Sequence, residues 1–300
     1  MTSYYKNCFW TSCLPAHTFA IMPTRPIISL TTDFGLTDPF VGVMHGVIAG
    51  ICPAAHVIDL THAVAAFDLL DGALAIWQAW RYFPTETVHV VVVDPGVGSE
   101  RQPLLSRMGN YWFIAPDNGA LTMVEREIRR DGGLVEHRRI ENPQYMLPTQ
   151  SCTFHGRDIF APAAAHLAAQ IERGAVASET FGPIVQRLIQ LPVPEPVQNP
   201  DGSIEGVILK VDRFGNLLTN LAASDLPDDL KNYSAVLENI RISRHCSFYA
   251  EAAGHESPDE IFSIVGSSGL LEFSVYRGSA YAKTGMAAGT RFKLLSNRSR

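Results

Sequence analysis

The chain has 300 residues, of which 46% are hydrophobic and 18% are charged, and its formal net charge is −6. This length and apolar content suffice for two globular domains with their own cores, and they exclude a largely disordered chain. The acidic balance, without any basic run interleaved with aromatic residues, excludes a nucleic-acid-binding protein and favours a small-molecule partner.

The cysteine pattern and the hydropathy predict a cytoplasmic protein without membrane association. The five cysteines are odd in number and include no Cys-x-x-Cys pair, which disfavours a disulfide framework and a thiolate zinc site. No segment approaches the roughly 18 uninterrupted apolar residues of a membrane-spanning helix. Residues 1–26 lack periodicity and the apolar core of a secretory signal, so we interpret them as a disordered N-terminal extension, with Met22 as a candidate working start.

Strand-like apolar runs alternate with helical patterns over residues 27–190. Apolar residues at three- and four-residue steps predict an amphipathic helix over 67–82, and Pro162 and Gly174 bracket a second helix over 161–172. This alternation predicts an α/β domain with a mostly parallel sheet and flanking helices. The predicted strands are residues 27–30, 57–60, 88–93 and 111–114.

Four prolines within residues 191–202 interrupt both kinds of pattern, so we predict a proline-rich linker there. The short runs beyond it are separated by Gly, Asn and Asp turns, which predicts a smaller antiparallel β-barrel or sandwich domain over residues 203–300. These runs are 206–211, 234–243, 261–265, 270–276 and 290–295.

The segment VHVVVVDPGVGSER, residues 88–101, joins a fully apolar run to a glycine turn. Pro95 and Gly96 end the strand, so Asp94 stands at the carboxyl end of a parallel strand, where open α/β sheets bind ligands. Asp94 and Arg101 are therefore candidate catalytic residues. The alternative is that Asp94 merely caps the turn and Arg101 is a solvated charge.

Three further segments carry candidate binding groups. His155, in the motif FHGRD before the helix at 161–172, can face a pocket or be a satisfied structural residue. In the motif KVDRFGNLLTN, Phe214 can stack on a nucleobase while Asn216 bonds its edge, or the two can form a hairpin turn. The small-residue turn at 266–269 would allow close approach of a ligand to the backbone.

A metal site is the main alternative for an enzyme. Carboxylates and a histidine are common ligands, and the candidates are Asp33, Asp38, Asp59 and His62. The chain contains no HExxH motif, and we interpret most of its histidines as structural, in particular His62, His89 and His166.

Seven motifs taken together resemble the S-adenosyl-L-methionine (SAM) hydroxide adenosyltransferase family, which is related to the fluorinases and chlorinases. They span residues 27–295 and read TTDFGLTD, VIDLTH, VVVDPGVGSER, IAPDNGAL, FHGRDIFAPAAAHLA, VDRFGNLLTNL and GSSGLLEFSV. The resemblance implies an α/β first domain, a β-barrel second domain and a homotrimer that binds substrate between one subunit's first domain and its neighbour's second. It implies SAM as the substrate, with no metal and no other cofactor.

The resemblance also implies roles for residues of the matching motifs. Asp94, Arg101 and His155 match the water-activating trio of the hydrolytic branch. The other matching residues are implied to bind the substrate. Asp33 matches a residue that binds the ribose hydroxyls, and Asp38 and Asp212 match residues that bind the amino-acid portion. Phe214 and Asn216 match the residues that bind adenine, Ser267 matches the methionine contact, and Glu272 and Val275 lie on the segment that lines the nucleoside pocket. Phe67 and Ser268 complete the candidate binding residues.

Four positions depart from the halogenases. Those enzymes carry a tyrosine and a serine suited to dehydrating a halide, and this chain has Asp94 and Gly156 at the two positions. A second tyrosine, beside that serine, is replaced by His155. The arginine that follows their substrate-binding serine is replaced by Ser268. A carboxylate close to a halide raises its energy by on the order of several kcal/mol, whereas water can donate hydrogen bonds to it. We expect water to attack ribose C5′ and release adenosine and L-methionine. The alternatives are a halogenase, a metal-dependent hydrolase and a non-catalytic adenosine or SAM binding module.

Overall fold

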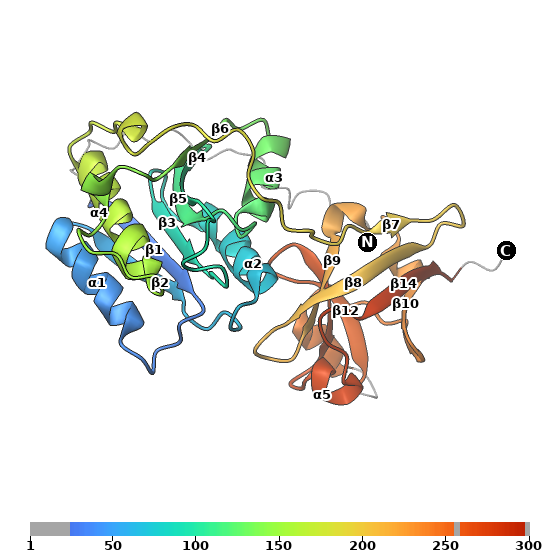
Figure 1. Cartoon of the computed structure of the whole chain (residues 1–300). Coiled ribbons are helices and arrows are strands. Elements are labelled where there is room, and N and C mark those ends of the chain that lie inside the picture. Colours follow the sequence, from blue (N-terminus) through green and yellow to red (C-terminus); the bar gives the residue numbers. More distant parts are fainter. Residues whose placement is uncertain (1–24, 255–258, 298–300) are drawn as a thin grey trace.

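The computed structural model describes residues 25–254 and 259–297, which form two domains side by side (Figure 1). The predicted N-terminal extension lies outside the described residues, apart from its last two. The predicted fold class is confirmed: a mixed, mostly parallel sheet with flanking helices is followed by an antiparallel, nearly closed barrel-like sheet. Within the described ranges, none of the helices has the length and hydropathy needed to cross a bilayer.

The first domain contains a six-stranded sheet with the strand order β2-β1-β3-β5-β4-β6. Strand β4 pairs antiparallel with β5 and β6, and the other pairs are parallel. The four predicted strands are confirmed, whereas β4 and β6 are not among the predicted strands. Strand β6 escapes the apolar pattern because it is an edge strand with mostly charged side chains. The strands are β1 (Ile27–Thr32), β2 (His56–Thr61), β3 (Val88–Val92), β4 (Pro103–Met108), β5 (Tyr111–Pro116) and β6 (Val135–Arg139).

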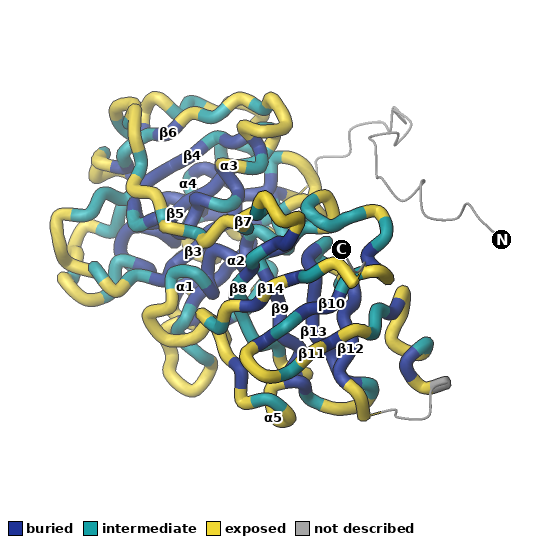
Figure 2. The backbone as a smooth tube through the Cα atoms, turned by 90° about the vertical axis from the view of Figure 1, so that its right-hand side faces the viewer, coloured by how far each residue is buried: buried dark blue, intermediate teal, exposed yellow. Residues whose placement is uncertain are grey.

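Helices cover both faces of this sheet because β3 is apolar on both sides. Val88, Val90 and Val92 pack in the cluster formed with α1 and α4, whereas Val91 packs in the cluster formed with α2 and α3. This alternation is the period-two geometry of a strand, and Figure 2 shows the resulting buried layer in dark blue. The helices are α1 (Phe40–Ile51), α2 (Leu69–Ala79), α3 (Thr122–Arg130) and α4 (Ala161–Glu172).

Both predicted helices are present. Helix α4 has the predicted bounds, and a π-helical turn, η3 (Gly156–Phe160), precedes it. Helix α2 begins at Leu69, two residues later than predicted, because Phe67 has a φ of +67° and the Asp68 side chain caps the helix by accepting from the Asp71 amide. The predicted start at Phe67 is therefore wrong, and this residue lies in a loop.

The second domain is one antiparallel sheet with the strand order β11-β10-β14-β8-β9-β13-β12, which a bridge between His245 and Ser263 helps to close. The predicted linker crosses to it, and the short strand β7 (Val197–Gln198) within the linker pairs with β8. The strands are β8 (Ile204–Val211), β9 (Leu217–Ala222), β10 (Tyr233–Leu237), β11 (Ile240–Ile242), β12 (Ile261–Val265), β13 (Leu270–Val275) and β14 (Arg291–Ser296), with helix α5 (Ala280–Thr284).

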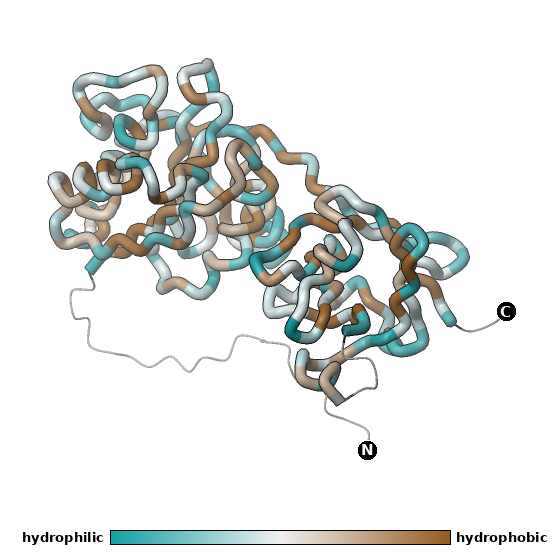
Figure 3. The backbone as a smooth tube through the Cα atoms, turned by 90° about the horizontal axis from the view of Figure 1, so that it is seen from below, coloured by the Kyte–Doolittle hydropathy of each residue, from teal (hydrophilic) through white to brown (hydrophobic). Residues whose placement is uncertain are grey.

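The two domains meet at α2, where Leu74 packs against Leu209 of β8 and Leu270 of β13. Figure 3 shows hydrophobic segments running through the middle of each domain and hydrophilic segments in the outer loops. The remaining elements are 3-10 turns: η1 (Trp80–Tyr82), η2 (Pro143–Tyr145), η4 (Ser178–Thr180), η5 (Ala223–Asp225), η6 (Leu230–Asn232) and η7 (Tyr249–Gly254).

Candidate active site

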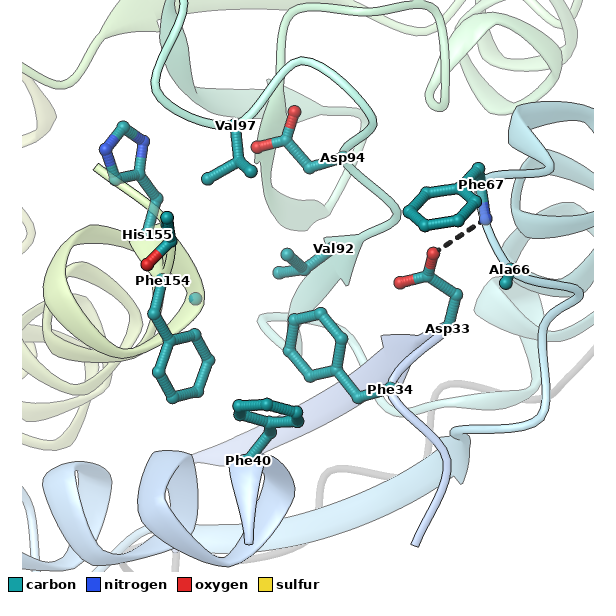
Figure 4. Close-up of a pocket in the computed structure, with 12 residues that line it drawn as sticks. Asp33, Phe34, Phe40, Ala66, Phe67, Val92, Asp94, Val97, Phe154 and His155 are labelled. Atoms are coloured by element: carbon teal, nitrogen blue, oxygen red, sulfur yellow. Dashed lines mark hydrogen bonds between the residues drawn. The ribbon is translucent and has the colours of Figure 1, made fainter. Parts of the chain in front are cut away.

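A pocket of about 290 Å³ opens at the carboxyl ends of β1 and β3, the edge at which open α/β sheets bind ligands (Figure 4). Its walls are the turns after these strands, the loop before α2 and the turn that leads into α4. We name it the Asp94 pocket, and it is lined by Asp33, Phe34, Phe40, Ala66, Phe67, Val92, Asp94, Val97, Thr153, Phe154, His155 and Gly156.

Asp94 and Arg101 form a shielded ion pair at this pocket. Arg101 Nε lies 3.1 and 2.9 Å from the two carboxylate oxygens, and a terminal nitrogen of the guanidinium lies 2.5 Å from Oδ2. The Arg101 and Asp94 side chains are only 7% and 5% exposed. The interpretation of Arg101 as a solvated charge is therefore wrong, because it is fixed to Asp94 by a charge-assisted fork.

A glycine lets this loop pack against the segment that carries His155. Gly98 has a φ of +79°, and a Cβ there would lie 2.3 Å from the carbonyl oxygen of Cys152. Only glycine combines this backbone conformation with such a close approach. The second glycine of the motif DPGVGSER thus allows the contact that brings Arg101 to His155, a role that the motif alone does not reveal.

Arg101 joins His155 to Asp94. A terminal guanidinium nitrogen lies 2.6 Å from His155 Nδ1. Because a guanidinium can only donate, Nδ1 accepts and the neutral ring carries its hydrogen on Nε2. Burial lowers the pKa of His155, and the positive charge of Arg101 lowers it further. The structure therefore brings the three predicted residues together, with Arg101 in the middle.

Asp33 and Phe67 lie next to each other on one side of the pocket, where Asp33 Oδ2 accepts from the Phe67 amide at 2.9 Å (Figure 4). Phe67 is 72% exposed although it lines the pocket. Asp38 lies in the exposed segment before α1 and does not line the Asp94 pocket. The candidate substrate-binding residues of this domain are Asp33, Asp38 and Phe67, and the structure brings Asp33 and Phe67 together in the pocket.

Three phenylalanines that motif reasoning does not single out form one wall of the pocket. Phe34, Phe40 and Phe154 make mutual edge-to-face contacts with ring centroids 5.2–5.9 Å apart. Gly156 permits this cluster, because a Cβ there would lie 3.1 Å from the Phe154 ring and 3.3 Å from that of Phe34. The signal available in the sequence is that each phenylalanine lies within two residues of a candidate site residue: Phe34 follows Asp33, Phe40 follows Asp38, and Phe154 precedes His155.

A second pocket of about 860 Å³ lies in the second domain, and we name it the Phe214 pocket. Phe214 is 78% exposed, whereas Asn216 is 6% exposed. Asp212 shapes their turn: its Oδ1 accepts from both of their amides at 2.8 Å, and its Oδ2 accepts from the Asn216 side-chain amide at 2.8 Å. The lining residues are Asp212, Phe214, Asn216, Tyr249, Ser267, Glu272, Val275, Tyr276, Arg277, Gly278 and Ser279.

Glu272 presents a largely buried carboxyl group to this pocket. Tyr249 donates its hydroxyl hydrogen to Glu272 Oε2 at 3.1 Å, and burial raises the pKa of Glu272. Ser267 and Val275 line the same pocket, as expected, while Ser268 lines an adjoining smaller one. Tyr249 is a residue that the sequence motifs miss, because it lies outside all seven of them.

The residues of the alternative metal site are not grouped around one point. Asp59 Oδ1 is hydrogen-bonded to His45 Nε2 at 2.8 Å and lies 3.0 Å from His62 Nε2, whereas Asp33 bonds the Phe67 amide. In the part of the chain that the structure describes, no group of three or more His, Cys, Asp and Glu side chains is arranged to hold a metal ion. The metal-dependent alternative therefore finds no support in this geometry.

His62 and His89 are buried and form hydrogen bonds with side chains of β1. His62 Nδ1 lies 2.8 Å from Thr32 Oγ1, and His89 Nδ1 lies 2.6 Å from Ser29 Oγ. Burial lowers the pKa of His89 to about 3, so this ring is neutral at physiological pH. Burial likewise lowers the pKa of His166. His166 is half-buried on α4 and packs edge-to-face against the Tyr145 ring, so the contacts of all three residues agree with a structural interpretation.

The two named pockets belong to different domains of the chain. All residues that line the Asp94 pocket lie within 33–156, and all that line the Phe214 pocket lie within 212–279. A third pocket of about 310 Å³ brings Gln78 and Tyr82 to Ser268 and its neighbours, but it contains no residue of the Asp94 pocket. The candidate catalytic and adenine-binding groups therefore do not share a cavity within one chain.

Comparisons with known proteins cover nearly the whole described chain. The N-terminal and C-terminal domain models of the SAM hydroxide adenosyltransferase family match residues 28–177 and 206–293. A crystal structure of an uncharacterized conserved protein from Thermotoga maritima is similar, with a TM-score of 0.78 and 32% identity, covering 89% of this chain and 99% of that one.

Curated relatives show the same likeness. The chain is 36% identical over 279 residues to the (R)-S-adenosyl-L-methionine hydrolase of Salinispora arenicola, covering 91% of this chain and 99% of that protein. It is also 36% identical over 277 residues to the protein of that name from Thermus thermophilus, covering 90% and 100%. A fluorinase of Actinoplanes is 29% identical over 226 residues, covering 67% and 74%. The predicted resemblance is confirmed, and this chain belongs to the SAM hydroxide adenosyltransferase family.

Proposed function

We propose that this chain hydrolyses SAM to adenosine and L-methionine. The observation that carries the proposal is the contact of Arg101 with both Asp94 and His155 at the pocket that contains Asp33. The relatives named (R)-S-adenosyl-L-methionine hydrolase support the choice of substrate. SAM is the substrate, and the proposed reaction needs no cofactor.

The reaction is a displacement at ribose C5′. The oxygen of a water molecule forms a bond to C5′, the C5′–sulfur bond breaks, and its electron pair goes to sulfur, so L-methionine leaves as a neutral thioether. The attacking water loses one proton. Because a sulfonium is already a good leaving group, the protein has mainly to align the water with the far face of C5′ and receive that proton.

We assign Asp94 as the acceptor of this proton. Nδ1 of His155 is occupied by Arg101, so the remaining N–H of the neutral ring can only donate. The Asp94 carboxylate keeps lone pairs beyond those that Arg101 engages. In this assignment Arg101 fixes the orientation of both partners, and His155 donates a hydrogen bond to the attacking oxygen.

The substrate is proposed to extend from one pocket to the other. Asp212 holds the Asn216 NH2 group, so the Asn216 carbonyl oxygen is the atom left to accept from the amino group of adenine, while the exposed Phe214 ring stacks on the base. Asp33 would accept from the ribose hydroxyls. The remaining proposed binding residues are Phe67 and Asp38 in the first domain and Ser267, Ser268, Glu272 and Val275 in the second.

We further propose that the chain acts as a homotrimer with its active sites between subunits. Because the Asp94 and Phe214 pockets lie in different domains, a substrate that touches both requires a second copy of the chain. Each pocket exposes a large aromatic residue, Phe67 or Phe214, that a neighbouring subunit would cover. A cyclic trimer sets each first domain against the next subunit's second domain and uses every pocket.

The pocket disfavours the halogenase alternative. A halide at the position of the attacking oxygen would meet the carboxylate of Asp94, which is largely shielded from water. Arg101 offsets part of the repulsion, but the shared fork leaves no free cation for the halide. Water gains from the same carboxylate, because it can donate to it.

The test is turnover of SAM in oxygen-18 water, with and without chloride and with and without EDTA. We expect the label in the 5′-hydroxyl of adenosine by mass spectrometry, at rates that neither addition changes. Both sulfonium epimers should be assayed, and by likeness to the named relatives we expect the (R) epimer to be preferred.

Each alternative has its own outcome in this assay. Formation of 5′-chloroadenosine would establish the halogenase, and loss of turnover with EDTA would establish the metal-dependent hydrolase. Recovery of tightly bound, unchanged ligand after long incubation would establish a binding module.

The pH dependence follows from the Arg101–His155 contact. Protonation of His155 Nδ1 would replace this hydrogen bond with two adjacent cations. Burial and Arg101 lower the pKa of His155, so we expect kcat/KM to persist as the pH falls through the ordinary histidine value of 6.5 and to decline only below it. The profile of His155→Asn, which does not titrate there, is the control. An acid limb at or above 6.5 in the parent protein would contradict the assignment.

We also propose that the chain works in the cytoplasm. Cys52, Cys152 and Cys246 are free thiols, and the odd number and scatter of the cysteines favour a reducing compartment. Fractionation of the native host followed by immunodetection would test this location.

A further inference from the structure

The carboxylate of Asp71, on α2, connects the second domain to the loop that lines the Asp94 pocket. Its Oδ1 pairs with Nζ of Lys210 on β8, and its Oδ2 accepts from the Ala65 amide at 2.8 Å. Asp71 is only 9% exposed, which distinguishes this pair from a loose surface ion pair. One side chain therefore contacts both the neighbouring domain and the backbone of the pocket.

The loop that Asp71 holds has an unfavourable backbone conformation. Phe67 has a φ of +67°, which disfavours any residue with a Cβ, and such conformations persist where surrounding contacts hold them. Two contacts do so here: the Phe67 amide donates to Asp33 and the Ala65 amide donates to Asp71. Ala66, which lies between the two bonded amides, and Phe67 both line the pocket (Figure 4).

The first turn of α2 is a rigid base for this loop. A Cβ at Gly72 would lie 2.8 Å from a methyl group of Val93, so the helix packs tightly against the residue that precedes Asp94. The Asp68 side chain caps the same turn by accepting from the Asp71 amide at 3.0 Å. Asp71 is thus placed between the end of β3 and the second domain.

A β-bulge turns Lys210 toward α2. The register of β8 against β9 shifts between Ile208 and Lys210, so the alternation of sides changes there. Ile208 and Val211 pack into the barrel core, whereas Leu209 packs against Leu74 of α2. Without the extra residue, regular alternation from Ile208 would direct Lys210 into the barrel.

We infer that Lys210 and Asp71 are positioning residues: their ion pair fixes the Ala65–Phe67 loop and thereby sets the affinity of the Asp94 pocket for its substrate. Neither side chain lines that pocket, so both act through the loop backbone. The inference rests on the proposed function for its effect on SAM, but its effect on the loop can be measured without any reaction.

The test uses Lys210→Met in the full chain, which keeps the apolar stem and removes the charge. We expect faster deuterium exchange in peptides that cover residues 64–69 of the substrate-free protein. We also expect the KM for SAM to rise about fivefold, with kcat within about twofold, because the loop affects binding rather than the proton transfer. Lys210→Arg, which restores the cation, should return both readouts toward the parent values.

Lys293→Met is the matched control. Lys293 pairs with Glu205, also on β8, at 2.8 Å and is mostly exposed, so its loss should change neither readout. Unchanged exchange at 64–69 in Lys210→Met, or exchange that rises equally throughout the first domain, would overturn the inference. If the parent protein fails to hydrolyse SAM, the proposed function fails instead, and the exchange experiment still decides the role of Lys210.

Discussion

Replacement of Asp94 by asparagine is expected to lower kcat for SAM hydrolysis about 10²–10⁴-fold while leaving adenosine affinity within about twofold of the parent value. The amide of Asp94→Asn keeps the shape of the side chain, but it cannot accept the proton that the attacking water loses. The residues proposed to bind adenine lie in the other domain, so nucleoside binding should persist. Single-turnover assays and calorimetric titration with adenosine measure the two effects separately.

Two further variants distinguish a loss of catalysis from a loss of folding. Asp94→Ala should also abolish hydrolysis, but it leaves Arg101 without its buried partner and is expected to lower thermal stability as well. Asp131→Asn removes an exposed carboxylate paired with Arg130 at the end of α3 and should leave kcat unchanged. Turnover by Asp94→Asn at the parent rate would remove this residue from the mechanism.

A mixture of Asp94→Ala chains and Phe214→Ala chains is expected to recover activity that neither has alone. The first variant lacks the proposed proton acceptor, and the second loses the proposed stacking on adenine, which is worth on the order of tenfold or more in affinity. If sites form between subunits, about one quarter of the sites in an equal, randomly assembled mixture combine an intact first domain with an intact second domain. Rates at low substrate concentration, with trimers verified by native mass spectrometry, measure the recovery.

The control for this experiment is a mixture of Asp94→Ala and Arg101→Gln chains. Both substitutions break the same ion pair of the first domain, so no assembly can restore an intact site. The opposite result is that mixed Asp94→Ala and Phe214→Ala trimers show no more activity than the same amounts of the two variants assayed separately and added. That result would show that each chain completes its own site. Recovery in the control mixture would show that mixing raises activity without any site gaining an intact first and second domain, and the complementation result could then not be attributed to shared sites.

Much of the framework follows from local sequence patterns. The apolar run that ends at Pro95 and Gly96 places Asp94 at the edge of the sheet, and Pro162 and Gly174 define the bounds of α4. These signals are local because strand and helix periodicity, chain breakers and caps act over a few residues. The same reasoning fails at Phe67, where the apolar spacing fits a helix but the hydrogen bond to Asp33 holds the backbone outside it.

The amino-acid pattern alone predicts the two sheet types, the proline-rich crossing between them and the motif residues that place the chain in its family. It does not predict that Arg101 reaches His155, 54 positions away, or that this contact makes the ring an acceptor at Nδ1. Nor does it predict that a bulge turns Lys210 to Asp71 or that the Asp94 and Phe214 pockets lie apart in one chain. The physical reason is that such contacts depend on how whole elements pack, and side-chain geometry across 50 or more residues leaves no periodic trace in the chain.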